Sequence, residues 1–308
     1  MKQALIDIGS NSVRLTVYDI RNSRFKILFR EKHMAGLAGY VSRKKLQPQG
    51  IECAVDALLD FRRTLTTLRI NQVAVFATAS LRNVSNTKEA VERIEAVTGF
   101  NVEVISGEEE ARLGYAGAMQ ELLITDGAFI DIGGASTEVV LFKKGKAEEA
   151  ASFGVGSLSL YRRCVKKIMP GKAGMSRIET ILGEEIDQKH MIRQEKRTPI
   201  IGVGGTARAV LKISKKYFGL QENSVSVTAA QVRELLEVLS RGDRKAIDLI
   251  LRNDADRIHT IVPGMMILVH IMDYLESEEL IVSRYGVREG YLCQRILTND
   301  ISTRRIAN

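Results

Sequence analysis

Apolar residues along the chain form short continuous runs, which alternate with longer stretches where apolar residues recur at helical spacing. A short apolar run bounded by Gly, Asp, Asn or Ser predicts a buried strand. Such runs occupy residues 3–8, 72–77, 102–105, 128–132, 199–203 and 280–283. Helical spacing predicts helices between them, for example from Gly50 to Leu68 after Pro48. Strands that alternate with helices predict an α/β protein.

Two stretches repeat one pattern of buried strand, aspartate, glycine turn, hydroxyl or amide residues and return strand. In the first, Asp7 precedes Gly9, Ser10, Asn11 and Ser12. In the second, the order is Asp131, Gly133, Gly134, Ala135, Ser136, Thr137 and Glu138. A length of 308 residues also suits two domains of roughly 150 residues each. We therefore predict two similar lobes, residues 1–122 and 123–308, with a last helix at 287–297 that packs on the first lobe.

The glycine turns suit the binding of anions. Glycine accepts positive φ and lets backbone N–H groups approach a ligand, while the neighbouring aspartate suits a divalent cation or a water. One such hairpin alone favours an ordinary tight turn, but its duplication favours a ligand site. A third turn, Gly202–Thr206, follows a strand and opens a helix, where Gly204, Gly205 and Thr206 would present N–H groups to an anion.

Helix starts are marked by pairs of polar residues three positions apart. Asn86 with Glu89, Ser106 with Glu109, and Ser176 with Glu179 each predict a capping box. Thr228 predicts the cap of a helix that runs to Ser240, and Gly99 predicts the end of the helix that begins after Asn86. Capping and the helix dipole suffice to explain Glu108 and Glu109.

Seven motifs in this order resemble the exopolyphosphatase and guanosine pentaphosphate phosphatase (Ppx/GppA) family, and they cover essentially the whole chain. The motifs are Asp7–Ser12, Ala77–Arg82, Ser106–Arg112, Asp131–Glu138, Gly154–Ser157, Gly202–Thr206 and Tyr285–Gly290. The family belongs to the superfamily of actin, hexokinase and the 70-kDa heat-shock proteins. The resemblance implies two lobes of the actin-like ATPase (ribonuclease H-like) fold, with the active site in a cleft between them.

The resemblance also implies the reaction and its residues. A phosphoanhydride hydrolase would release the terminal phosphate of inorganic polyphosphate or convert pppGpp to ppGpp. Glu110 corresponds to the general base, and Asp131 would act with it. Mg²⁺ or Mn²⁺ would bind Asp131, Glu138 and Asp7. The expected phosphate-binding residues are Gly9, Ser10, Asn11, Ser12, Arg82, Gly133, Gly134, Ala135, Ser136, Thr137, Gly204, Gly205 and Thr206.

Three departures from the family pattern bear on activity. Ala135 stands where the family often has a third glycine, and the loop from Gly36 to Gly39 lacks the usual acid. The chain also lacks the long C-terminal extension of larger members. This short form predicts a distributive enzyme, a preference for shorter chains, or compensation by formation of a homodimer.

The composition of the chain restricts which classes of binding partner are expected. The formal charge of +8 favours an acidic partner, although solubility alone explains it equally well. Nucleic acid is disfavoured because the chain has no Trp and no basic run interleaved with aromatics. Its three cysteines fit no metal spacing, its four histidines suggest structural roles, and no apolar run could cross a membrane. We therefore expect a cytoplasmic protein.

Two other functions stay open at this stage. A small-molecule kinase of the same superfamily would transfer phosphate to a hydroxyl group, although the acidic start of the helix at Glu108–Glu110 favours the phosphatase. A silent nucleotide-binding or polyphosphate-binding module would keep the fold without catalysis, but the retained acids Glu110, Asp131 and Glu138 argue against it. The choice between polyphosphate and pppGpp is also open.

Overall fold

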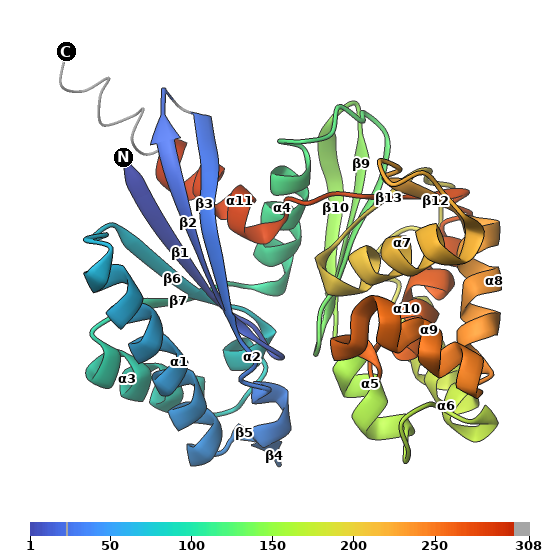
Figure 1. The fold of residues 1–308 in the computed structure, drawn as a ribbon, viewed down its shortest axis with the longest axis horizontal. Coiled ribbons are helices and arrows are strands. Elements are labelled where there is room, and N and C mark those ends of the chain that lie inside the picture. The colour runs from blue at the N-terminus through green and yellow to red at the C-terminus, as the bar shows by residue number, and fades with distance from the viewer. Residues whose placement is uncertain (23, 299–308) are drawn as a thin grey trace. The chain divides into compact units, whose positions relative to one another are not determined.

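The computed structural model describes residues 1–22 and 24–298 of the chain. The chain forms two compact units (Figure 1). Unit 1 comprises Met1–Glu109 and the segment that begins at Leu292, and unit 2 comprises Glu110–Tyr291. The boundary at residue 122 and the cleft between the lobes stay predictions.

Unit 1 is built on a five-stranded sheet of order β3-β2-β1-β6-β7. Its strands are β1 (Lys2–Ile8), β2 (Val13–Arg21), β3 (Arg24–His33), β6 (Val73–Ala77) and β7 (Val102–Val104). Strands β1 to β3 pair antiparallel, whereas β1, β6 and β7 run parallel. Apolar residues of α1 (Pro48–Thr67) and α3 (Thr87–Thr98) share one core with Ala4, Ile6 and Ile8 of β1. These helices therefore cover one face of the sheet.

Short elements complete unit 1. They are the 3-10 helix Leu37–Tyr40, the small sheet of β4 (Val41–Ser42) with β5 (Lys45–Leu46), the helix α2 (Ala79–Arg82) and the π-helical turn Leu292–Leu297. Arg295 in that last turn forms ion pairs with Glu103 and Glu109. This part of the expected last helix therefore contacts unit 1 directly.

Unit 2 repeats the plan of unit 1 in a six-stranded sheet of order β10-β9-β8-β11-β13-β12. Its strands are β8 (Gly127–Ile132), β9 (Thr137–Lys143), β10 (Lys146–Phe153), β11 (Ile200–Val203), β12 (Ser226–Thr228) and β13 (Glu279–Val282). Again a first antiparallel group, β8 to β10, precedes strands that run parallel to its first member, here β11 and β13, while β12 pairs antiparallel with β13 at the edge. The repeated hairpins in the sequence thus correspond to the same two strand positions in both sheets.

The helices of unit 2 lie on both faces of this sheet. Alternate residues of β8 enter different cores: Ala128, Ile130 and Ile132 pack with the larger set of helices, and Phe129 packs with α4. The helices are α4 (Gly107–Ala118), α5 (Ser157–Cys164), α6 (Lys172–Leu182), α7 (Gly204–Phe218), α8 (Ala229–Ser240), α9 (Arg244–Asp254), α10 (Ile261–Tyr274) and α11 (Val287–Tyr291). A π-helical turn, Gly183–Asp187, follows α6, and a 3-10 turn, Ala255–Arg257, follows α9.

Helix starts show where the sequence predictions succeed and fail. Thr228 accepts a hydrogen bond from the Gln231 N–H and completes the predicted cap, and Gly99 ends α3 with φ +69°. The predicted box at Asn86 is wrong, because the Asn86 amide exchanges two hydrogen bonds with the Leu46 backbone instead. The box at Ser176 is wrong as well, because α6 begins at Lys172 after Gly171, so Ser176 lies inside the helix.

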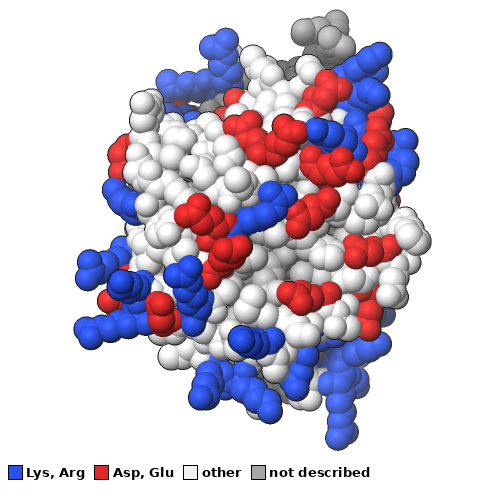
Figure 2. Space-filling model, turned by 90° about the vertical axis from the view of Figure 1, so that its right-hand side faces the viewer, with Lys and Arg blue, Asp and Glu red and all other residues white. Residues whose placement is uncertain are grey.

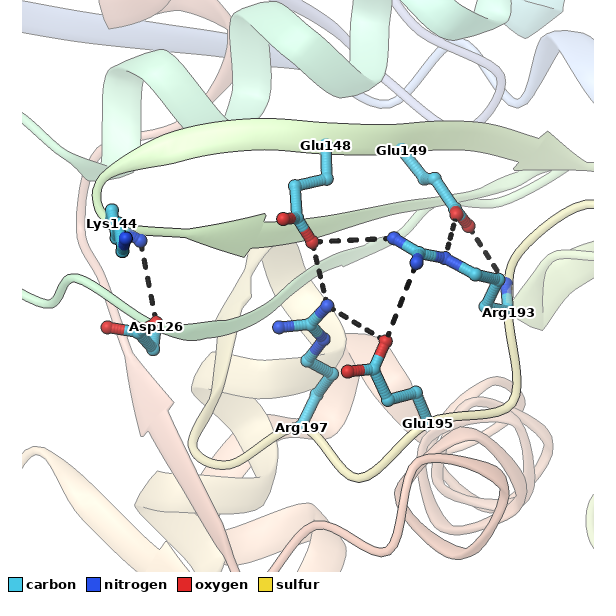
Figure 3. A network of polar contacts seen from close by, with 7 residues as sticks. All are labelled: Asp126, Lys144, Glu148, Glu149, Arg193, Glu195 and Arg197. Carbon is cyan, nitrogen blue, oxygen red and sulfur yellow. Dashed lines mark hydrogen bonds and ion pairs between the residues drawn. The ribbon is translucent and has the colours of Figure 1, made fainter.

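A network of charges fastens the segment before β11 to the hairpin strand β10 (Figure 3). The guanidinium of Arg197, only 6% exposed, contacts Glu148 at 2.7 Å and Glu195 at 3.0 Å. Arg193 pairs with Glu149, and that hydrogen bond raises the pKa of Arg193. These partners account for the charge run before Pro199, so it needs no ligand. Among the described residues, no helix is both long and apolar enough to span a bilayer.

Candidate active site

The first glycine turn joins β1 to β2 and is held by its neighbours. Gly9 N–H donates to the Ser12 carbonyl at 3.2 Å, and a Cβ on Gly9 would lie only 3.0 Å from the same oxygen. The carbonyls of Ser10 and Asn11 accept hydrogen bonds from the loop of Ala38 and Gly36, respectively. With its carbonyls engaged in this way, the turn has a defined shape even without a ligand.

One hydroxyl side chain and one cationic side chain, those of Ser80 and Arg82, follow the end of the parallel strand β6. Ser80 donates to the Ile8 carbonyl at 2.5 Å, which ties α2 to the end of β1. Arg82 is half-buried and donates to the Ile105 carbonyl at 3.3 Å. Both residues therefore lie at the edge of the unit 1 sheet where β1 and β6 end, which is where open α/β sheets bind ligands.

The second glycine turn joins β8 to β9 and receives the start of α5. The N–H of Ser157 donates to the Gly133 carbonyl, and those of Leu158 and Ser159 donate to the Gly134 carbonyl. The carbonyls of the turn thus cap this helix. The backbone N–H groups of Gly134 and Ala135, in the turn itself, are the donors that could bind an anion.

Carboxylates line one face of the unit 2 sheet beside this turn. Asp131 and Glu138 lie directly opposite each other on β8 and β9, a pairing that brings Cβ atoms to about 4.5–5.5 Å. Glu138 is buried and accepts a hydrogen bond from Ser152 at 2.8 Å. Because side chains alternate along a strand, Asp131 shares its face with Phe129, which packs with α4.

Helix α4, which carries Glu110, packs on this same face of the sheet. A Cβ on Gly114 would lie 2.6 Å from the Phe129 ring, and Tyr115 packs on Phe142, which pairs with the first residue of β8. The middle of α4 therefore packs over β8 and β9. Glu110, one turn before Gly114, shares a helix face with it. The hydroxyl of Ser106 accepts the N–H of Glu109 at 3.1 Å, which is one half of the predicted capping box, while the Glu109 carboxylate pairs with Arg295.

Glycines let α4 approach its neighbours closely. A Cβ on Gly117 would collide with the backbone at Gly286, and one on Gly290 would collide with the carbonyl of Leu113. Glu289 is buried and accepts the Gly286 N–H at 3.0 Å. The Tyr285–Gly290 motif therefore holds the helix that carries Glu110.

The third glycine turn touches Asp131. Gly204 has φ +79°, and a Cβ there would collide with Oδ1 of Asp131. Val203, just before it, lies beside Asp131 in the parallel ladder. Gly204 thus gives the Asp131 carboxylate direct access to the first turn of α7, where the leading N–H groups of a helix are available to an anion.

One cation near this site was missed by the sequence analysis. The guanidinium of Arg257, from the 3-10 turn after α9, lies against Gly205, where any Cβ would collide with it. Burial lowers the pKa of Arg257, and the charges of Asp254, Asp256 and Asp131 oppose that effect. The only hint in the sequence was the Gly204–Gly205 pair, which allows another group to lie on the backbone.

Two predicted phosphate-binding side chains, those of Thr137 and Thr206, are buried. The Thr137 hydroxyl donates to the Val155 carbonyl at 2.7 Å. Thr206 is 1% exposed, and its side chain packs against Gly264. Any contact with phosphate from these two residues would have to use backbone groups.

No preformed metal cluster is present: within residues 1–22 and 24–298, no three His, Cys, Asp or Glu side chains gather in a way that could hold an ion. The opposed pair Asp131 and Glu138 nevertheless fits Mg²⁺, which proteins commonly bind through one or two carboxylates together with substrate phosphates. The residues present therefore suit an ion that arrives with its substrate.

Residues 16–299 match the Ppx/GppA phosphatase family. The chain belongs to this family. Among solved structures, a Ppx/GppA family member from Aquifex aeolicus is 26% identical, with a TM-score of 0.78 over 97% of this chain and 99% of that one. Another structure of the Aquifex aeolicus PPX-GPPA enzyme is 27% identical, with a TM-score of 0.74 over 95% and 99% of the two chains.

The fold agrees with that of more distant relatives. An exopolyphosphatase from Cytophaga hutchinsonii is 24% identical, with a TM-score of 0.84 over 97% of this chain and 98% of that one. The fold is therefore the actin-like ATPase fold of Ppx/GppA proteins, with one mixed sheet in each unit, and the predicted fold class is confirmed.

Proposed function

We propose that this protein hydrolyses phosphoanhydride bonds and releases the terminal phosphate of inorganic polyphosphate or of pppGpp. The observation that carries the proposal is the opposed pair of Asp131 and Glu138 on the face of the unit 2 sheet against which α4, the helix of Glu110, packs. Such hydrolysis needs a positioned water, a base for its proton and groups that neutralise the phosphates. Family membership supports the same reaction class.

A residue can be proposed for each of these chemical requirements. Glu110 would take the proton of the attacking water, while Asp131 would orient that water or hold the metal. Arg257 and the N–H groups of Gly134, Ala135 and Gly205 would offset the charge that develops on the phosphoryl oxygens. Arg82 and the turn from Gly9 to Ser12 would bind further phosphates.

A divalent cation fits the acidic pair. Mg²⁺ or Mn²⁺, held by Asp131 and Glu138 with substrate oxygens, would neutralise charge on the phosphates. Asp7 is a weaker candidate ligand because it lies opposite Arg14 across the β1–β2 ladder. The pair in unit 2 is therefore where we expect the ion.

One assay separates this function from its rivals. The purified protein is incubated with Mg²⁺ and polyphosphate, pppGpp, or ATP with candidate hydroxyl acceptors, and free phosphate is measured. Release of phosphate from polyphosphate or pppGpp supports the hydrolase, and the relative rates identify the substrate. Phosphate transferred to an acceptor would indicate a kinase. Binding without turnover would indicate a silent module.

A further inference from the structure

A long stretch of unit 2 carries cations without acids. From Ala150 to Ile178 the sequence has no Asp or Glu and six basic residues, which make up most of the formal net charge of +8. We call these six side chains the cationic corner: Arg162, Arg163, Lys166, Lys167, Lys172 and Arg177. All six are exposed, and none forms an ion pair with any residue in the described part of the chain.

The fold gathers these charges in one region. Arg162 and Arg163 lie in the last turn of α5, and α6 follows after a short loop. A Cβ on Gly174 would lie 2.9 Å from the Cys164 carbonyl, so the end of α5 packs closely on α6. Burial raises the pKa of the Cys164 thiol, while Arg163 and Arg177 both lower it, which places these two cations near the same sulfur.

The surface view agrees with this grouping. Lys and Arg side chains gather along the lower edge of the face in Figure 2, the level at which α5 and α6 lie in Figure 1. Like charges held together without acidic partners repel one another. An anionic ligand bound to such a surface would reduce this repulsion.

Helix α5 connects the cationic corner to the candidate phosphate turn. Its first N–H groups donate to the carbonyls of Gly133 and Gly134, and its eight residues span about 12 Å, with Arg162 and Arg163 of the corner in the last turn. Tyr161 of α5 packs on His259 with ring centroids 5.0 Å apart, and His259 follows Arg257 by two residues. The contact between Tyr161 and His259 thus joins α5, which carries two residues of the corner, to the segment of Arg257.

We infer that the cationic corner binds the distal part of a linear inorganic polyphosphate whose terminal phosphates occupy the turn at Gly133–Gly134. The inference rests on the proposed function and adds a second, chain-length-dependent contact. Single-stranded nucleic acid fits less well, because Tyr161 is the only aromatic residue between positions 154 and 178. Its hydroxyl donates to the Lys167 carbonyl and its ring packs on His259, so it offers bases little stacking surface.

The test compares two double charge reversals on a Glu110→Gln background, which is expected to slow turnover, and binding is measured without added divalent cation. The first is Lys166→Glu with Lys167→Glu. The matched control is Lys143→Glu with Lys146→Glu, which form an exposed cross-strand pair. Lys143 ends β9, whereas the glycine turn lies at the other end of that strand, roughly 20 Å away. Binding of end-labelled long polyphosphate and of tripolyphosphate is followed by fluorescence anisotropy at several salt concentrations. Thermal unfolding verifies that both variants are folded.

The corner variant should bind long polyphosphate roughly tenfold more weakly, with a smaller salt dependence, and should bind tripolyphosphate normally. The control should lose much less affinity for the long chain. Equal losses in both variants, or none in either, would overturn the inference. Single-stranded RNA that competes with long polyphosphate at equal charge would overturn the choice of ligand. If wild-type protein releases no phosphate while the corner variant still loses affinity, the proposed function fails and the binding site stands.

Discussion

The two glycine hairpins share a backbone plan and differ in the residue that faces the aspartate. Asp7 in unit 1 lies opposite Arg14, whereas Asp131 in unit 2 lies opposite Glu138. An acid opposite a base is neutral as a pair, but two carboxylates side by side favour a bound cation or proton. Arg257 supplies part of that positive charge from within unit 2. Under the proposed function, this difference assigns phosphate binding to unit 1 and the chemical step to unit 2.

The largest expected effect is a difference in kcat between variants of two neighbouring glutamates on α4, Glu110 and Glu109. Glu110→Gln keeps the shape of the side chain but cannot accept a proton, so kcat should fall by about 10²–10⁴-fold with the fold intact. Glu109→Gln removes the same charge from the same helix start. It should cost at most a few tenths of a kcal/mol of dipole interaction, plus the exposed pair with Arg295, and turnover should be near normal. Small, equal losses of kcat in both variants would assign Glu110 to the cap and leave Asp131 to activate the water.

The next test addresses the opposed acids directly. Asp131→Asn should lower kcat by about 10²–10³-fold and raise the Mg²⁺ concentration needed for half activity, because one of two carboxylates is lost. Asp7→Asn should leave the Mg²⁺ dependence unchanged, since its neighbour is Arg14. Metal titrations of both variants measure the contrast. Full activity after exhaustive EDTA treatment would contradict a metal requirement altogether.

Removing a cation from each unit should have smaller effects than removing the acids, and the kinetic effects should differ between the units. Arg82→Ala should raise KM by roughly tenfold or more with little change in kcat, because a charged hydrogen bond to phosphate is worth about 1.5–3 kcal/mol. Arg257→Ala should lower kcat as well, since this side chain lies near Asp131. Steady-state kinetics on one substrate separates the two patterns. An identical change in KM and kcat for both variants would remove the functional distinction between the units.

The smallest effect concerns salt. Electrostatic binding of phosphates weakens as ions screen it, so KM for long polyphosphate should rise several-fold between low and physiological salt while kcat changes less. Initial rates across a salt series provide the measurement. A KM that does not respond to salt would indicate that binding depends on other contacts.

The sequence could predict what local patterns determine. The paired hairpins, the helix from Pro48 and the cap at Thr228 each depend on residues close together in the chain, and the structure contains all of them. Resemblance to a family supplied the roles of Glu110 and Asp131, and the helix of Glu110 packs on the sheet face that carries Asp131. Those roles stay predictions until the variants are measured.

The failures share a physical cause, which is contact between distant segments. Asn86 lost its capping role because the backbone of Leu46, forty residues away, offered two hydrogen bonds. Arg257 could not be recognised because its importance depends on lying over Gly205, fifty-two residues earlier. The hydroxyl of Thr137 likewise turned to the Val155 carbonyl. Single-sequence patterns carry no information about such partners.

The backbone contacts of α4 have a consequence for motion. Where Gly117 and Gly290 bring two backbones into contact, the helix cannot slide or rotate without a steric clash. Glu110 and Asp131 therefore belong to one unit, whose backbone contacts fix how α4 packs, whereas Arg82 belongs to the other unit. If the two acids act together as proposed, their geometry is determined within a single unit.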